Sequence, residues 1–159
     1  MRKGYNIPIW STFILLLIMF DQLTKLLIVK SLEVGESLKV INHVIYITSH
    51  RNQGAAWGIL QGKMWLFYIV TIVVLVILIV FFKNEGYGKP LTQLGLSLLI
   101  AGSIGNFIDR LFRGEVVDFV DTYIFGYNFP IFNVADASLT IGVVVLILVI
   151  LFESKEEKA

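Results

Sequence analysis

Several residue types and patterns are scarce or missing from this 159-residue chain, and each absence removes a class of protein. The chain has no cysteine, which excludes disulfides, a thiol nucleophile and a cysteine-ligated metal. Only 16% of residues are charged and they form no basic block, so we expect no nucleic-acid partner. His43 and His50, the two histidines, lack the His-Glu-x-x-His pattern of a membrane zinc peptidase, and we expect both to be ordinary exterior residues. In contrast, 57% of residues are hydrophobic, which predicts a membrane protein.

Four stretches are long and apolar enough to cross a bilayer, which takes about 20 helical residues. They cover residues 9–29, 64–82, 90–111 and 137–152. The first contains Asp21 and Lys25, yet its hydrophobic pattern continues through residues 26–29 without a small-x-small cleavage site, so we expect a span and not a cleaved signal peptide. The sequence therefore predicts an all-α membrane protein with a single four-span domain over residues 1–159.

The two longer connections, residues 31–63 and 112–136, lie on the same side of the membrane in a four-span chain. Each contains a segment rich in β-branched and aromatic residues, 44–48 and 116–120, which predicts a small extracytoplasmic β-cradle. Residues 55–62 are amphipathic and fit either a short interfacial helix that acts as a lid or an ordinary loop anchored by Trp57. Because Arg2 and Lys3 precede the first span, the positive-inside rule predicts that both termini are cytoplasmic.

Aspartate is the most informative polar residue, because a carboxylate in or beside a membrane is costly and is a functional candidate by default. The chain has five, all predicted to lie toward the exterior face: Asp21, Asp109, Asp118, Asp121 and Asp136. Asp21 and Lys25 share a helix face, which fits either a buried structural ion pair or a contact with substrate. A proton-coupled carrier is the main alternative class, but carriers prefer such groups near the midplane between repeats.

A stripe of small and polar residues follows one face of the third predicted span. Gly95, Gly102, Asn106 and Asp109 are spaced by seven, four and three residues, which places them on a narrow strip of a helix. The glycines fit close helix packing. Asn106 and Asp109, together with Arg110, fit either a hydrogen-bonded scaffold or direct contact with a site.

Asp118 follows the third predicted span, and Asp136 directly precedes the fourth. Taken alone, Asp136 fits a helix N-cap and Asp118 a turn residue. The connection between these spans can fold back and bring the two carboxylates together, in which case they share a proton because both cannot readily ionise side by side. Such a pair can activate water and protonate a carbonyl oxygen, which is the chemistry of peptide hydrolysis.

Five blocks of sequence resemble, in order and spacing, the signature blocks of lipoprotein signal peptidase. They are DQLTK at 21–25, NQGAAWG at 52–58, GNFIDR at 105–110, VVDF at 116–119 and FNVAD at 132–136. The resemblance spans nearly the whole chain, and none of the blocks departs from the pattern. It implies a bacterial plasma-membrane enzyme, with its active site at the outer face, that cuts prolipoproteins before a diacylglyceryl-modified cysteine.

The resemblance also implies roles for individual residues. Asp118 and Asp136 would be the catalytic dyad, a choice that the residues by themselves leave open. Supporting or substrate-contacting positions would be Asn52, Gly54, Asn106, Arg110, Asn133 and Ala135. Asp21, Lys25 and Asp109 would be mainly structural. The family needs no metal or organic cofactor, so the implied partners are diacylglyceryl-modified prolipoproteins and membrane lipids, and we expect a monomer.

Overall fold

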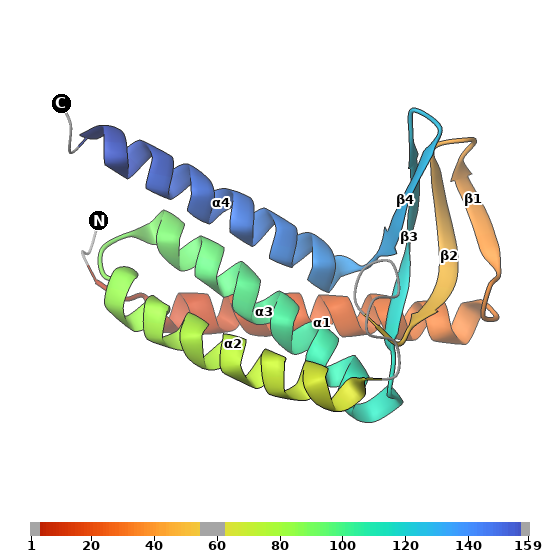
Figure 1. The fold of residues 1–159 in the computed structure, drawn as a ribbon, viewed down its shortest axis with the longest axis horizontal. Helices are drawn as coiled ribbons and strands as arrows, with labels where there is room; N and C mark the ends of the chain where they lie inside the picture. Colours follow the sequence, from red (N-terminus) through yellow and green to blue (C-terminus); the bar gives the residue numbers. More distant parts are fainter. Residues whose placement is uncertain (1–3, 55–62, 157–159) are drawn as a thin grey trace.

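The computed structural model describes residues 4–54 and 63–156, which form four long helices and a four-stranded sheet (Figure 1). The helices are α1 (Ile7–Ser31), α2 (Met64–Glu85), α3 (Pro90–Arg113) and α4 (Val134–Glu156). All four are long and apolar enough to span a membrane, which confirms the predicted architecture. Each helix extends beyond its predicted span. Since α4 begins at Val134 and not at residue 137, Asp136 lies inside the helix, and the prediction that it precedes the helix is wrong.

The sheet is antiparallel throughout, with the strand order β1-β2-β3-β4. Its strands are β1 (Ser37–Ile41), β2 (Ile45–Asn52), β3 (Val116–Ile124) and β4 (Tyr127–Phe132). The predicted β segments 44–48 and 116–120 overlap β2 and β3, whereas β1 and β4 were not predicted. Pro130 in β4 cannot donate a ladder hydrogen bond, which an edge strand tolerates. The predicted interfacial helix over residues 55–62 lies outside the described residues.

Helix α3 is the central helix of the bundle and contacts α1, α2 and α4. Its predicted stripe is buried, and Gly102 faces α4. A Cβ added at Gly102 would lie 2.5 Å from the backbone oxygen of Ala135, so a larger residue would push the two helices apart. This close approach holds the first turn of α4, which includes Asp136, against Asn106 of α3.

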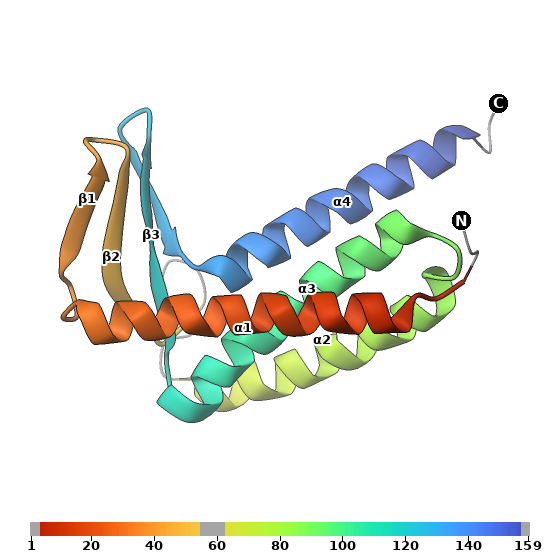
Figure 2. The ribbon, with the colours of Figure 1, turned by 180° about the vertical axis from the view of Figure 1, so that it is seen from behind.

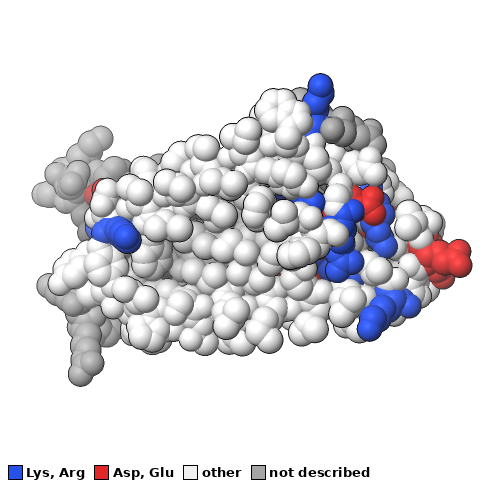
Figure 3. All heavy atoms as spheres, turned by 90° about the horizontal axis from the view of Figure 1, so that it is seen from below, with Lys and Arg blue, Asp and Glu red and all other residues white. Residues whose placement is uncertain are grey.

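Many apolar side chains are exposed and several charged side chains are buried, which is the reverse of the pattern in a water-soluble protein. Among the described residues, α2 buries none of its side chains, and the buried residues of α1 are Asp21 and Lys25. Exposed valine, leucine, isoleucine and phenylalanine cover the outer surfaces of the helices. Figure 3 shows a long face that is free of charged side chains over its middle and has Lys, Arg, Asp and Glu toward the ends. The chain is therefore a multi-pass membrane protein whose apolar helix surfaces face lipid.

The sheet lies at one end of the bundle, with its strands running crosswise to the helices (Figures 1 and 2). The start of α1 and the end of α4 both lie at the opposite end. An even number of spans explains this arrangement. That the end far from the sheet is cytoplasmic stays a prediction.

Candidate active site

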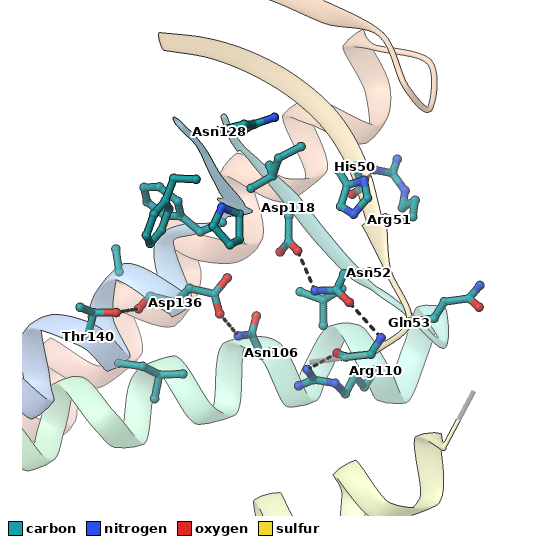
Figure 4. Close-up of a pocket in the computed structure, with 18 of the residues that line it drawn as sticks. His50, Arg51, Asn52, Gln53, Asn106, Arg110, Asp118, Asn128, Asp136 and Thr140 are labelled. Carbon is teal, nitrogen blue, oxygen red and sulfur yellow. Dashed lines mark hydrogen bonds between the residues drawn. The ribbon is translucent and has the colours of Figure 1, made fainter. Parts of the chain in front are cut away.

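A cavity of about 980 Å³ lies between the sheet and the neighbouring parts of α3 and α4. Figure 4 shows Asp118 on β3 and Asp136 on α4 with their carboxylates directed into the space between these two elements. The predicted site residues that line the cavity are Asn52, Gly54, Asn106, Arg110, Asp118 and Asp136. Residues more than 80 positions apart in the chain, from β2 to α4, therefore meet at one polar surface.

Asn133 connects the two carboxylates. Its Nδ2 donates a hydrogen bond to Oδ1 of Asp118 at 2.7 Å, and its backbone N–H donates to Oδ2 of Asp136 at 3.2 Å. The backbone N–H of Asp136 donates in return to Oδ1 of Asn133 at 2.9 Å. These reciprocal bonds resemble a capping box, in which Asn133 caps α4 and Asp136 is the acidic residue three positions later. The cap of α4 is thus Asn133, and the alternative that Asp136 is the N-cap is wrong.

The side-chain amides of Asn52 and Asn133 each turn their NH₂ group toward Asp118, because a backbone N–H donates a hydrogen bond to the oxygen of each amide. The backbone N–H of Gly54 donates to Oδ1 of Asn52 at 2.9 Å, so the NH₂ group of Asn52 must face the other way. That group donates to Oδ2 of Asp118 at 3.1 Å. The N–H of Asp136 orients Asn133 in the same manner. Both oxygens of Asp118 consequently receive an amide donor.

A buried cation fixes the amide that faces Asp136. Lys25 Nζ lies 2.9 Å from Oδ2 of Asp21 and 3.1 Å from Oδ2 of Asp109, and all three side chains are almost fully buried. The same ammonium donates to Oδ1 of Asn106 at 3.0 Å. Because an ammonium cannot accept, the NH₂ group of Asn106 is turned to Oδ1 of Asp136, at 2.7 Å. The predicted Asp21–Lys25 pair thus belongs to an ion cluster that adjoins the cavity.

Replacing Lys25 with methionine is expected to lower the free energy of unfolding by about 3–5 kcal/mol, because two buried carboxylates lose their shared cation. The measurement is the thermal unfolding of the purified protein in detergent. Lys30→Met provides a matched control, since Lys30 lies on the same helix and is exposed. Equal melting temperatures for the two variants would show that the cluster does not stabilise the fold.

The ionisation of Asp118 is displaced toward neutral pH. The pKa of Asp118 is raised to about 7, first by burial and then by the nearby carboxylate of Asp136, while the hydrogen bonds from Asn52 and Asn133 oppose the shift. An ordinary aspartate is almost fully ionised at pH 7. Asp118 is therefore able to hold a proton at a pH where most carboxyl groups have lost theirs.

The remaining predicted residues, Arg110 and Ala135, lie in different surroundings. Arg110 places its guanidinium 4.7 Å from the centre of the Phe67 ring and donates through Nη2 to the backbone oxygen of Gly54 at 3.4 Å. Ala135 is buried at the α3–α4 interface, and its N–H donates to Oδ1 of Asp21 at 2.9 Å. Arg110 thus borders the cavity, whereas Ala135 connects α4 to the ion cluster.

Sequence reasoning missed several residues that line the cavity. His50 is exposed, as expected of an exterior residue, but it is also paired opposite Asp118 in the β2–β3 ladder and lines the cavity. The aromatic residues Tyr127, Phe129 and Phe132 of β4 also line the cavity. The aromatic residues in segment 127–132 favour a strand, whereas Pro130 in the same segment disfavours one because proline cannot donate a ladder hydrogen bond. For His50 the missing information was the register between β2 and β3.

The chain is similar to known proteins over nearly its whole length. The family model described as signal peptidase (SPase) II matches residues 13–152. The chain is 53% identical over 158 residues to a lipoprotein signal peptidase of Staphylococcus carnosus (strain TM300), covering 99% of each chain. It is 51% identical to that of Staphylococcus aureus (strain bovine RF122 / ET3-1), covering 99% of this chain and 97% of the relative.

Two solved structures, each of a bacterial membrane enzyme determined by the in meso method, have the same fold. The structure at 2.3 Å resolution has a TM-score of 0.93 at 50% identity and covers 98% of this chain and 95% of that one. The structure at 1.9 Å resolution has a TM-score of 0.88 at 52% identity, with coverages of 95% and 97%. The chain therefore belongs to the signal peptidase II family and is a multi-pass membrane peptidase.

Proposed function

We propose that the chain is an aspartic endopeptidase that removes the signal peptide from diacylglyceryl-modified prolipoproteins by cutting before the lipidated cysteine. The observation that carries the mechanism is the pair of carboxylates, Asp118 and Asp136, that Asn133 joins within one cavity. Membership of the signal peptidase II family supports the prolipoprotein substrate. This chemistry needs no metal or organic cofactor.

Asp118 and Asp136 each accept two hydrogen bonds, but they lie in different backbone environments. Asp136 lies in the first turn of α4, where the helix dipole favours a negative charge. The raised pKa of Asp118 favours its neutral form. We therefore assign Asp136 as the general base and Asp118 as the general acid of the first step.

The proposed reaction has two steps. In the first, Asp136 takes a proton from water as the water oxygen attacks the scissile carbonyl carbon, and Asp118 donates its proton to the carbonyl oxygen. In the second, the carbon–nitrogen bond breaks, Asp136 gives its proton to the leaving amine, and Asp118 recovers a proton from a hydroxyl of the intermediate. Both carboxyl groups thereby return to their starting states, as a catalytic cycle requires.

The walls of the cavity suit a lipid-linked peptide. Beside the polar groups lie the aromatic residues Tyr127 and Phe129 of β4 and the aliphatic residues Leu139 and Ile141 of α4. An apolar signal helix that is already in the bilayer would reach this region by lateral diffusion, while water enters from the aqueous side. We place the cavity at the outer face of the bacterial plasma membrane, with both termini cytoplasmic.

The direct test uses the purified chain in detergent and two forms of one prolipoprotein, with and without the diacylglyceryl group. We expect cleavage of the modified form, with mass spectrometry identifying a new N-terminal diacylglyceryl-cysteine, and much slower cleavage of the unmodified form. If the folded chain cleaves neither form, the proposed function is wrong and the proton-coupled carrier becomes the leading alternative. Equal cleavage of both forms would contradict the requirement for the lipid.

A further inference from the structure

The four-stranded sheet has two chemically different faces. In an antiparallel sheet, paired residues lie on the same face, and successive residues of a strand alternate between faces. The ladder pairs Leu38 with Ile47, Ile47 with Val120 and Val120 with Phe132, and it pairs Ile41 with Ile45, Ile45 with Thr122 and Thr122 with Phe129. Counting along β3, these residues share the face of Asp118. Asp118, His50 and Asn52 lie on the part of this face that lines the cavity, and the rest of the face is mostly apolar.

The opposite face carries the buried Val117 and Phe119 near the bundle, and its outer part is polar. Thr48 donates a hydrogen bond to Asp121 at 2.9 Å, and Asn128 donates to the hydroxyl of Tyr123 at 3.3 Å. Lys39 is exposed and pairs with Tyr46, which places it on this face as well. The sheet is therefore amphipathic, and its polarity reverses between neighbouring residues such as Leu38 and Lys39.

The apolar face is directed toward the membrane side of the sheet. Asp118, which marks this face, points toward α3 and α4 (Figure 4). The strands run crosswise to the helices, and both hairpin turns lie at the end of the sheet that extends away from the bundle (Figures 1 and 2). The outer part of the apolar face thus projects beside α4, whose exposed surface carries Ile141, Val144 and Leu148. Phe129 of the sheet and Ile141 of α4 line the same cavity, so the two apolar surfaces meet along its walls.

A group of large apolar side chains covers the outer part of this face and its tip. We call it the cradle rim; its members, between 42% and 105% exposed, are Leu38, Ile41, Ile124, Phe125, Tyr127 and Phe129. A group of several large, exposed apolar side chains on a protein surface marks a contact with a partner or a membrane. The helices already face lipid, so the rim extends that lipid-facing surface.

Phe125 at the tip is an unusual residue for its position. It forms a two-residue hairpin turn with Gly126, and both have positive φ, 51° and 81°. Such turns favour Asn-Gly, because a bulky residue is strained at positive φ. The Phe125 side chain is also completely exposed, at 105%. Neither the backbone nor packing against the residues that the structure describes accounts for phenylalanine here, whereas aromatic residues are favoured at membrane interfaces.

We propose that the cradle rim docks on the outer-leaflet lipid surface beside α4, with Phe125 inserted at the level of the lipid headgroups. Docking would hold the sheet, and with it Asp118, at a constant height relative to the bilayer. Tyr127 and Phe129, at the inner edge of the rim, also line the cavity, whereas the outer part of the rim lies beside the exposed apolar surface of α4, so its occupant is bilayer lipid. The proposal concerns the resting protein and does not depend on the proposed peptidase activity.

The absence of native cysteine allows a direct test with single-cysteine variants. Phe125→Cys, Leu38→Cys and Lys39→Cys are each labelled with the fluorophore NBD and reconstituted into phosphatidylcholine/phosphatidylglycerol vesicles that contain lipids with a nitroxide near the headgroup. We expect strong quenching and blue-shifted emission at positions 125 and 38, and little of either at position 39, the adjacent residue on the polar face. Similar quenching at positions 38 and 39, or none at position 125, would overturn the proposal. Quenching at the rim that appears only after prolipoprotein is added would assign the rim to substrate and also overturn it.

A second variant separates lipid contact from a role in folding. Phe125→Asn restores the favoured Asn-Gly turn, so we expect an unchanged or higher melting temperature in detergent. In vesicles the same substitution is expected to reduce the quenching of NBD at position 38. A lower melting temperature in detergent, or unchanged quenching in vesicles, would show that Phe125 does not serve lipid docking.

Discussion

Replacing either Asp118 or Asp136 with asparagine is expected to lower kcat for prolipoprotein cleavage by about 10²–10⁴-fold, the usual contribution of a positioned acid or base. Asparagine cannot take a proton from water and cannot donate one with the acidity of a carboxyl group. Both variants keep the size and planar shape of the side chain, so KM is expected to change much less than kcat. The measurement is a steady-state rate on a diacylglyceryl-modified prolipoprotein in detergent.

Asp121→Asn is the matched control for these variants. Asp121 lies on the same strand as Asp118 but on the opposite face of the sheet, where it accepts a hydrogen bond from Thr48. We expect this variant to cleave at a rate close to that of the unaltered chain. Parent-like cleavage by Asp118→Asn or Asp136→Asn would reject the dyad, and an inactive Asp121→Asn variant that is fully folded would contradict the assignment of the reaction to the cavity face.

The cleavage rate is expected to fall about tenfold per pH unit above pH 7, as a single required proton is lost. The sign follows from the proposed acid: with its pKa raised to about 7, Asp118 is protonated and competent below that pH, and ionised without a proton to donate above it. At low pH the rate is expected to fall again as the base accepts a proton. The resulting bell-shaped dependence of the rate on pH reports the titration of the coupled pair and not of two independent residues. A rate that stays constant between pH 6 and pH 9 would contradict the mechanism.

Other charged groups near Asp118 need a control in this experiment. Asp136, Lys25 and Arg110 interact with it electrostatically, and His50 is paired opposite it. An ordinary histidine titrates in the same pH range. We therefore expect His50→Gln to keep the alkaline fall in rate. If that fall disappears, the titrating group is His50 and not Asp118.

The hydrogen bond from Asn52 offers an independent check on the same assignment. This bond lowers the pKa of Asp118 by stabilising its charged form. Asn52→Ala removes the donor, so the alkaline limb of the rate profile is expected to move to higher pH. A limb that moves to lower pH would contradict the assignment of Asp118 as the acid.

Local features of the sequence were sufficient to predict the membrane architecture. A run such as residues 64–82 is apolar over the full thickness of a bilayer, and no distant contact is needed to recognise it. The four-residue spacing of Asp21 and Lys25 likewise follows from helix geometry. The proposed catalytic residues were named through resemblance to a family, because position alone left Asp21, Asp109, Asp118 and Asp136 comparable.

The tertiary structure decided which distant side chains meet. Whether Asp118 faces α4 depends on the register of β3, and a shift of one residue would turn it to the opposite face of the sheet. The contact between Lys25 and Asn106 depends on how closely α1 packs against α3, and the place of Asp136 within α4 depends on the cap that Asn133 forms. Hydrophobic length and helical spacing are properties of neighbouring residues and are visible in the sequence. Strand register and helix packing are set by contacts between residues far apart in the chain, so only the folded structure reveals them.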